Sequence, residues 1–410
     1  MPSWRDFFGA ATSPAPVVEE RNAPMNFGRE DLIPLPGSNY ATWTGMYLRD
    51  DQAAGLPAVG GAVRLIAESI GSLPCIVYSG TGPDRQKANT TPQWDLLHER
   101  PSMDCTPFDL FSDIAACVET RGNAFLQKVR DARGRVVELI VIDPDAVRVY
   151  RSAETREKTF DIQAGDDRYT GLTSTDILHV RGMTLRGGIR GISPIELHRN
   201  SIAMSYAVQE YIGRYFQNDA SPGLVIKVPG SLSNQQARQI LEVFASNHSG
   251  LGNAHRPGIL AGGADLDQVK VNLSDTTAID AQKFAVREVA RMFNIPASLL
   301  GANEGTSRAP EDEAASFLKF GLGPRLRRIE SALRADPDLF GGTDLYPEFK
   351  VDSLLRADTT ERYTAYVAAR QAGWLSANEI RELENYPAVP DGDNVQQTPV
   401  GGAPNPTPET

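Results

Sequence analysis

Cysteine and histidine are scarce in this 410-residue chain, which contains three cysteines and five histidines. Cys75, Cys105 and Cys117 form neither an even disulfide framework nor a pair at metal-binding spacing, so the sequence indicates a reducing compartment. The histidines are scattered, and none belongs to an HExxH motif. They are His98, His179, His198, His248 and His255. We therefore expect no metal site.

Long apolar runs are also absent from the sequence. No stretch approaches the roughly 20 apolar residues that a transmembrane helix needs. The N-terminal segment MPSWRDFFGAATSPAP lacks the apolar core of a signal peptide. These absences predict a soluble intracellular protein without a membrane partner.

Catalytic motifs are missing as well, since neither a P-loop nor a GxSxG nucleophile motif occurs. Single residues that could carry chemistry have simpler interpretations. His179 lies in a predicted strand and is expected to be structural, and Cys117 lies on the apolar face of a predicted helix. The glycine-rich stretch Gly187–Gly191 precedes a helix whose first turn suits a cap better than a phosphate site. We expect no catalytic residue, no enzyme activity and no cofactor.

Acidic residues outnumber basic ones, with 52 Asp and Glu against 41 Lys and Arg and a formal net charge of −11. Tight binding to DNA regardless of its sequence needs a basic surface, so the composition argues against it. An acidic surface past which duplex DNA slides is compatible with this charge. The length allows two or three domains with cores of their own.

The most informative part of the chain begins with a predicted helix over residues 276–294. Its apolar side chains recur at helical spacing, and Pro296 ends it because proline disfavours helical backbone in the preceding residue. A polar loop over 302–309 follows. Pro310 then suits the first position of a second helix, where the missing N–H costs nothing. The pattern predicts a polar loop presented by two helices.

The second helix, over residues 310–334, contains Gly321, Gly323 and Pro324 in its interior. An interior proline removes a backbone hydrogen bond and costs about 3 kcal/mol. A helical pattern that continues through such a break predicts a kinked helix. The alternative is two short helices joined at a corner.

Basic side chains form a row on the first of these helices, where Lys283, Arg287 and Arg291 recur every four residues. Acidic residues lie at helical spacing from this row, so ion pairs within the helix or with another subunit are one interpretation. Contact with a phosphate backbone is the other. A second basic cluster follows the predicted kink and consists of Arg325, Arg327 and Arg328.

The remaining elements place the chain in the α+β class. Strands are predicted over 123–181 as one mostly antiparallel sheet with helices beside it, and an apolar helix is predicted over 193–218. A β-α-β-β module occupies 219–275, with a helix capped by Ser233 and a strand at 258–261. Other strands and helices are predicted at 75–78, 346–351, 106–121, 360–372 and 376–386, and capping boxes at Thr106 and Ser376 open the helices 106–121 and 376–386. Residues 1–56 and 387–410 are rich in Pro, Gly and Asn, and we expect the first to be a partly disordered arm and the second a disordered tail.

The order of these pieces resembles the portal proteins of tailed bacteriophages of the siphovirus type. The resemblance covers roughly residues 57–390, and its specificity lies in the ordered set and not in any one motif. The stretches that carry it are IAESIGSLPCIVY at 66–78, GNA at 122–124, DILHVRG at 176–182, GISP at 191–194, 211–222, 225–233, 284–301, 324–333, FKVDSLLRAD at 349–358 and 372–383.

The resemblance implies a portal-type subunit with named parts. The wing corresponds to 57–192 and 335–357, and the stem to the helix 193–218 and to the helix and turn 276–301. The small clip of mixed helix and strand corresponds to 219–275, and the short helical crown to 358–386. The tunnel loop is 302–309 and the kinked helix is 310–334.

The resemblance also implies a function. A dodecameric ring of this chain would form at one capsid vertex, and double-stranded DNA would pass through it during packaging and ejection. The implied partners are the terminase large subunit, the major capsid protein or scaffold, and a head–tail adaptor. The implied location is the virion, with the host cytoplasm during assembly. A ring of strongly acidic chains would keep duplex DNA from sticking in the tunnel.

The loop residues that would face the DNA are Asn303, Glu304, Thr306, Ser307 and Arg308. Glu304 and Arg308 leave this loop with a net charge near zero. Two alternatives stand beside the portal reading. One is a nucleic-acid-processing enzyme with an unrecognised carboxylate site for Mg²⁺, and the other is an assembly scaffold without a DNA path.

Overall fold

The computed structural model describes residues 42, 50–80, 85–152, 155–185, 187–217, 224–227, 233–248, 265–268, 275–302, 310–351, 359–384 and 386–395. It divides into two compact units, one made of Met1–Arg308 and Ser316–Phe349 and the other of Ala309–Ala315 and Lys350–Thr410. The predicted loop at 303–309, the strand at 258–261, the tail from 396 and most of the N-terminal arm lie outside the described residues. One short helix, α1 (Asp50–Ala54), falls in the segment that the sequence assigned to the arm.

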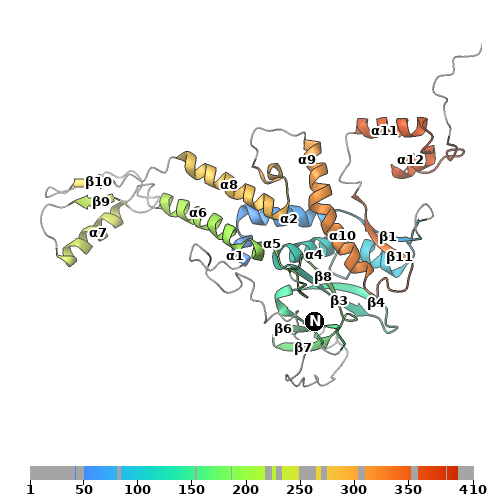
Figure 1. The fold of residues 1–410 in the computed structure, drawn as a ribbon, viewed down its shortest axis with the longest axis horizontal. Helices are drawn as coiled ribbons and strands as arrows, with labels where there is room; N and C mark the ends of the chain where they lie inside the picture. The colour runs from blue at the N-terminus through green and yellow to red at the C-terminus, as the bar shows by residue number, and fades with distance from the viewer. Residues whose placement is uncertain are drawn as a thin grey trace, which may run out of the picture. The chain divides into compact units, whose positions relative to one another are not determined.

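Two helices at the centre of the first unit begin and end where local sequence signals place them (Figure 1). Helix α2 (Pro57–Gly71) buries Val59, Ile66 and Ile70 on one face. Helix α4 (Pro107–Arg121) packs against α2 and starts with the predicted capping box. The Thr106 hydroxyl accepts a hydrogen bond from the Asp109 amide at 3.2 Å, and the Asp109 carboxylate accepts one from the Thr106 amide at 3.1 Å.

The strands between residues 123 and 181 form two antiparallel three-stranded sheets and not the single sheet that the sequence predicted. One sheet has the order β4-β3-β8, from Val136–Ile142, Asn123–Arg130 and Ile177–Arg181. The other has the order β5-β6-β7, from Val147–Arg151, Lys158–Ala164 and Asp167–Leu172. Alternating apolar residues give no information on which strands pair, so the division into two sheets was not visible in the sequence. Phe125, Phe160 and Ile162 share one buried cluster, which joins the two sheets.

A third sheet joins segments that lie far apart in the chain. Strand β1 (Cys75–Ser79) pairs on one side with β11 (Leu345–Phe349) and on the other with the short β2 (Gln86–Lys87). The helical segments α3 (Pro92–Trp94) and η4 (Asp95–Glu99) follow β2. The chain therefore returns to its N-terminal part after α10 (Gly323–Arg334).

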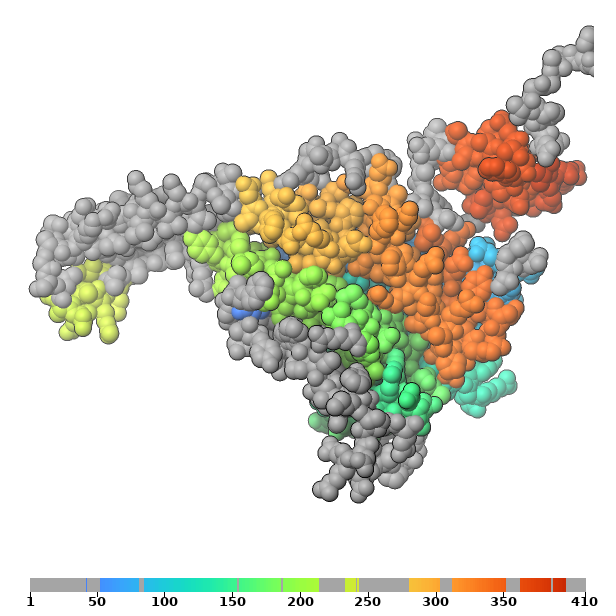
Figure 2. All heavy atoms as spheres, viewed as in Figure 1, coloured from blue at the N-terminus to red at the C-terminus, as the bar shows by residue number. Residues whose placement is uncertain are grey.

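The predicted helix over 193–218 is interrupted at His198, which separates α5 (Pro194–Leu197) from α6 (Arg199–Gln217). Ser193 caps α5 as predicted, because its hydroxyl accepts the Glu196 amide at 2.9 Å. Helix α6 packs against α8 (Asp275–Phe293), and the two lie side by side in the space-filling view (Figure 2).

The segment between these two helices contains strand β9 (Leu224–Lys227), helix α7 (Asn234–His248) and strand β10 (Asp265–Gln268). The two strands pair antiparallel, with Leu266 opposite Ile226. Ser233 caps α7 as the sequence indicated, since its hydroxyl accepts the Gln236 amide at 3.3 Å.

The second unit contains helices α11 (Thr359–Gln371) and α12 (Ala377–Leu383). Helix α12 starts with the predicted capping box. The Ser376 hydroxyl accepts the Glu379 amide at 3.1 Å, and the Glu379 carboxylate accepts the Ser376 amide at 2.6 Å. Gly373, in left-handed backbone with φ of 74°, closes α11.

Candidate functional site

The helical junction around residues 293–334 carries the loop that the sequence singled out. Helix α8 ends at Phe293, and Asn294 adopts left-handed backbone with φ of 54°. Pro296 then precedes the 3₁₀ turn η7 (Ala297–Leu300), which Gly301 closes with φ of 81°. The end of the helix and the turn that the sequence predicted are thus present, and residues 303–309 follow directly after the turn.

The backbone after the loop is helical from Pro310 to Arg334, with one irregular segment inside. It consists of α9 (Pro310–Ser316), the π-helical segment η8 (Phe317–Leu322) and α10. The irregularity is this wider turn, which accommodates one extra residue just before Pro324.

Two carbonyl groups in the turn before Pro324 accept hydrogen bonds from side chains. One of them, that of Phe320, lies one turn before the proline, which has no N–H to donate to it. The Phe320 carbonyl accepts the side-chain amide of Asn294 at 2.7 Å. The Gly321 carbonyl accepts the guanidinium of Arg325, also at 2.7 Å. Asn294 therefore links the end of α8 to the proline-containing turn.

The packing of α8 against this turn also requires a glycine at position 321. A Cβ at this position would lie 2.7 Å from the Phe317 ring and 3.0 Å from the Asn294 carbonyl oxygen. The Phe317 ring and the Asn294 backbone thus approach too closely for a side chain. The sequence placed Gly321 at a helix kink, and the structure shows that close packing excludes a side chain at this position.

Arg325 connects three elements through its guanidinium. It donates to both carboxylate oxygens of Glu119 in α4, at 2.7 and 2.9 Å, and to the Phe293 carbonyl at 3.0 Å. The Glu119 side chain is almost fully buried and that of Arg325 mostly so. Such a bidentate pair in a buried place fixes geometry, because both partners are held in one plane. Arg325 is therefore part of the internal structure, where Glu119 and the Phe293 carbonyl occupy its guanidinium.

Arg328, one turn further along α10, is half-buried. Burial lowers the pKa of its guanidinium, although Glu119 acts in the opposite direction. Arg327 is exposed. The predicted basic cluster after the irregular turn thus separates into two residues that face the interior and one that faces solvent.

The basic row on α8 is only partly explained by pairing within the helix. Arg291 forms an ion pair with Glu288, as the pairing interpretation expected. The Arg287 side chain donates to the Lys283 carbonyl at 3.4 Å, and Lys283 itself is exposed. The loop residues Asn303, Glu304, Thr306, Ser307 and Arg308 lie outside the described residues.

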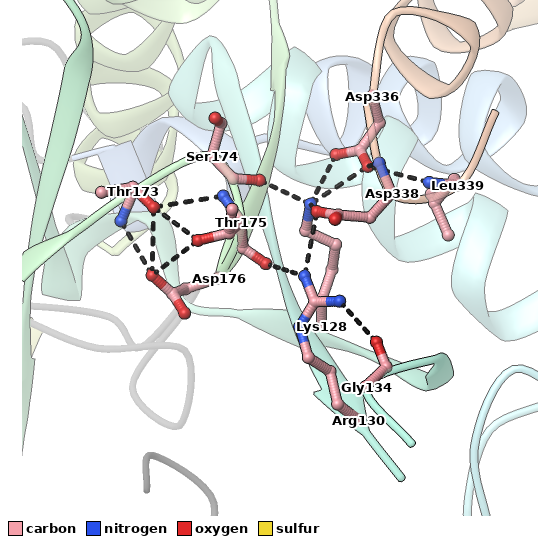
Figure 3. A network of polar contacts seen from close by, with 10 residues as sticks. All are labelled: Lys128, Arg130, Gly134, Thr173, Ser174, Thr175, Asp176, Asp336, Asp338 and Leu339. Carbon is pink, nitrogen blue, oxygen red and sulfur yellow. Dashed lines mark hydrogen bonds and ion pairs between the residues drawn. The ribbon is translucent and has the colours of Figure 1, made fainter. Parts of the chain in front are cut away.

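A buried ionic network was missed by the sequence analysis (Figure 3). The Lys128 ammonium, on β3, is completely buried and lies 2.8 Å from Asp336 and 2.7 Å from Asp338, in the segment that follows α10. Arg130 pairs with Asp338 at 2.9 Å and donates to the Thr175 carbonyl at 2.6 Å. The network ties β3 to the end of α10 and to the turn before β8.

A lysine in the middle of the buried strand NAFLQKVR is the one sequence signal that could have pointed to this network. A charged group in such a place needs an acidic partner, because removing an unpaired charge from water costs far more than folding can supply. The identity of that partner was not readable, since Asp336 lies 208 residues further along the chain.

His179 has the structural role that the sequence predicted. Its Nε2 lies 3.0 Å from the Asn123 side-chain oxygen, and its ring stacks on Phe125 with centroids 4.5 Å apart. Burial, followed by the nearby charges of Lys158, Arg181 and Arg190, lowers the pKa of His179 well below its usual value. The ring is therefore neutral at physiological pH.

The cysteines are poor nucleophiles. Burial raises the pKa of Cys117 to about 12, and burial also raises the pKa values of Cys75 and Cys105. In the described part of the chain, no three His, Cys, Asp or Glu side chains gather as they would around a metal ion. None of the helices among those residues is long and apolar enough to cross a bilayer.

Comparison with known proteins decides the family. The family model for phage portal proteins matches residues 57–385. This chain belongs to the phage portal protein family. The match starts at residue 57, the predicted start of the wing, and ends at residue 385, within the predicted crown.

Individual relatives agree with this assignment. The probable portal protein of Streptomyces phage phiC31 is 32% identical over 408 residues, which are 96% of this chain and 87% of the relative. The portal protein of Enterobacteria phage HK97 is 26% identical over 354 residues, covering 84% of this chain and 82% of the relative.

Solved structures share the fold. A chain from the neck of an empty gene transfer agent particle superposes with a TM-score of 0.61 at 24% identity, covering 82% of this chain and 92% of that one. A portal protein of the HK97 family from Corynebacterium diphtheriae superposes with a TM-score of 0.56 at 19% identity, covering 74% and 96%. The α+β portal-type fold is thus confirmed, whereas no comparison supports a nucleic-acid-processing enzyme.

Proposed function

We propose that this chain forms a ring at one vertex of a phage capsid and that DNA is packaged and ejected through the ring. The observation that carries the proposal is the match to the portal family over residues 57–385. A homo-oligomeric ring is supported by structural neighbours from the necks of gene transfer agent particles, computed with C6 and C12 symmetry. We propose twelve copies in the ring, and the C12 symmetry of the second neighbour is the support for this number.

The elements can be assigned to portal parts on this basis. The wing takes the two sheets of residues 123–181, helices α2 and α4, and the β1–β11 pair. The stem takes α6 and α8, and the clip takes β9, α7 and β10. The crown takes α11 and α12. The support for this assignment is the order of the elements along the chain together with the extent of the family match.

The loop 302–309 is the part we assign to the DNA path. The junction that delivers it is stiff, because Asn294 and Arg325 fix the irregular turn to the end of α8. A polar loop between such supports suits transient contact with a moving duplex. The net charge of −11 for each chain disfavours retention of the duplex by the rest of the surface.

The role is structural and not catalytic, and the partners follow from it. A portal ring must meet the terminase large subunit while DNA enters, and later a head–tail adaptor. It must also meet the major capsid protein or scaffold. The protein is then found in the virion after assembly in the host cytoplasm.

The first test is the native mass of the purified chain together with negative-stain images of the same sample. We expect a ring of about a dozen chains with a central hole, because closed rings arise from head-to-tail contacts of one kind. A compact dimer without a hole would contradict the proposal. A magnesium-dependent DNA cleavage activity that copurifies with the chain would contradict a purely structural role.

A further inference from the structure

The helix pair α11–α12 lacks a hydrophobic core of its own. Among the described residues after Phe349, no apolar side chain is buried, whereas the buried apolar side chains of the described residues all lie in the first unit. Ordering a helix costs conformational entropy that buried apolar surface has to offset. The pair therefore needs a second surface to cover it.

Large apolar side chains of this pair are instead exposed. Trp374, on the turn between the helices, is 79% exposed, which is the largest exposed fraction among the exposed large apolar residues of the structure's described part. The others are Tyr363, Val367, Leu383 and Tyr386. Single exposed apolar residues are ordinary, but five within one helix pair without a core mark an interaction surface.

The same pair contains a hollow of suitable chemistry, which we call the aromatic groove. Its volume is ≈ 340 Å³, and its walls include Tyr363, Tyr366, Val367, Ile380, Arg381 and Tyr386. The wall is held in place by polar contacts, since Glu384 accepts the Tyr366 hydroxyl at 3.1 Å and the Arg362 guanidinium at 3.1 Å. The groove is thus preformed and mostly apolar.

Trp374 is not part of the wall of the groove in its own chain. The Trp374 side chain and the aromatic groove are therefore separate patches. The side chain fits a groove, and the groove fits an apolar side chain. Two separate complementary patches on one chain give a head-to-tail contact, and such contacts close into a ring when the rotation fits. A second copy of this chain satisfies both patches at once.

The charges of the two helices favour the same arrangement. The exposed Arg370 lies on α11, while the exposed Glu379 and Glu382 lie on α12. A contact that brings α11 of one copy against α12 of the next places opposite charges near each other. The Arg381 guanidinium, 5.5 Å from the Tyr386 ring centroid, adds a cation at the edge of the groove. An indole ring entering the groove can stack against this guanidinium.

We propose that Trp374 of each copy inserts into the aromatic groove of a neighbouring copy, so that α11 and α12 complete their core between subunits. This inference rests on the proposed ring and names the contact that joins its crown. A tryptophan in an apolar pocket is a typical centre of binding energy, since it buries a large rigid surface at little entropic cost.

The direct test is photo-crosslinking in the full-length chain, with p-benzoylphenylalanine in place of Trp374. This substitution keeps an aromatic ring at the position and reacts with whatever surrounds it. Chains labelled with ¹⁵N are mixed with unlabelled chains before ring assembly. We expect cross-links to peptides from 359–371 or 377–386, about half of which join labelled to unlabelled chains.

Two results would overturn the inference. Cross-linked peptides that always carry one isotope would show that Trp374 contacts its own chain. Cross-links to other parts of a neighbouring copy would show that the groove is not the site. The native mass of the same sample separates the two levels: a ring without these cross-links removes the inference and leaves the ring standing, whereas absence of any ring removes both.

Truncation supplies an independent measurement. Trp374→Ala should raise the concentration at which rings dissociate at least tenfold, because the groove loses its occupant in every subunit contact. The melting temperature of the monomer should not change, since the side chain is exposed there. Met103→Ala, which truncates an apolar residue that is 73% exposed in the first unit, is the matched control and should leave ring dissociation unchanged. Equal behaviour of the two variants would overturn the inference.

Discussion

Asp338 illustrates how a buried network makes one carboxylate pH-sensitive. Burial alone would raise the pKa of Asp338, but hydrogen bonds and charges from Lys128 and Arg130 outweigh it, so the pKa lies below its usual value. A lowered pKa in the folded state gives stability that is complete above the unfolded-state pKa of about 3.9. This stability is lost as the pH falls through the lower, folded-state pKa.

We therefore predict a pH-dependent difference between the wild type and Asp338→Asn. The free energy of unfolding should differ between the two by a constant amount from about pH 7 to pH 5, and the difference should shrink below about pH 4. Urea denaturation at a series of pH values measures it. Asp344→Asn, at an exposed position, is the control and should change the free energy of unfolding by less than about 0.5 kcal/mol. A difference for Asp338→Asn that persists at the lowest pH would refute the prediction.

Arg325 is the residue on which the junction depends. Arg325→Ala leaves the nearly buried Glu119 carboxylate without its partner, and breaking a buried pair in this way typically costs about 3–5 kcal/mol. Thermal or urea unfolding measures the loss. Arg327→Ala, two residues away and exposed, should change stability by less than about 0.5 kcal/mol. Similar losses for both variants would show that the Glu119 contact is not the cause.

At the scale of elements, the π-helical segment η8 depends on a glycine. Gly321→Ala should destabilise the protein by about 1–3 kcal/mol, because the new methyl group would overlap the Phe317 ring. Gly213→Ala in α6 is the matched control. No atom lies within 4 Å of a Cβ there, so alanine should stabilise that helix by up to about 1 kcal/mol. A stabilising effect at both positions would refute the close packing that we assign to Gly321.

Local sequence signals predicted where many helices begin or end. They did not predict which distant segments of the chain contact one another. The capping boxes at Thr106 and Ser376 and the turn at Gly301 follow from side chains a few residues apart, so the sequence states them directly. The break at His198 and the π-helical turn were missed, because helical periodicity does not register a single irregular residue.

The missed part of the candidate site has a common cause. The contact between Arg325 and Glu119 joins residues 206 positions apart, and the pairing of β1 with β11 joins segments that lie still further apart in the chain. A single sequence gives no information on which distant residues meet, so Arg325 was grouped with its neighbours Arg327 and Arg328 as one basic cluster. The portal resemblance supplied the overall order of parts but not these contacts.

At the scale of the whole molecule, the loop 302–309 is predicted to matter for DNA and not for assembly. Deleting residues 304–307 should leave ring formation unchanged and reduce the yield of DNA-filled particles, because the deletion removes the part assigned to the DNA path. Particle counts by electron microscopy and ring mass measure the two effects. Deleting residues 403–406, beyond the family match, is a control of equal length. Unchanged DNA filling after the loop deletion would favour an assembly scaffold without a DNA path.

Helix α10 is fastened at both of its ends, to α4 and to β3. Near its start Arg325 holds Glu119, and just after its end Asp336 holds Lys128. A rod pinned at two points can neither slide along its axis nor pivot. Mechanical force on the loop therefore cannot be relayed through α10 to the strand β11 beyond it. The wide turn at Phe317–Leu322 is held as well, since Asn294 donates to the Phe320 carbonyl, so a load that reaches α10 is shared with α8 and α4 and leaves β11 at rest.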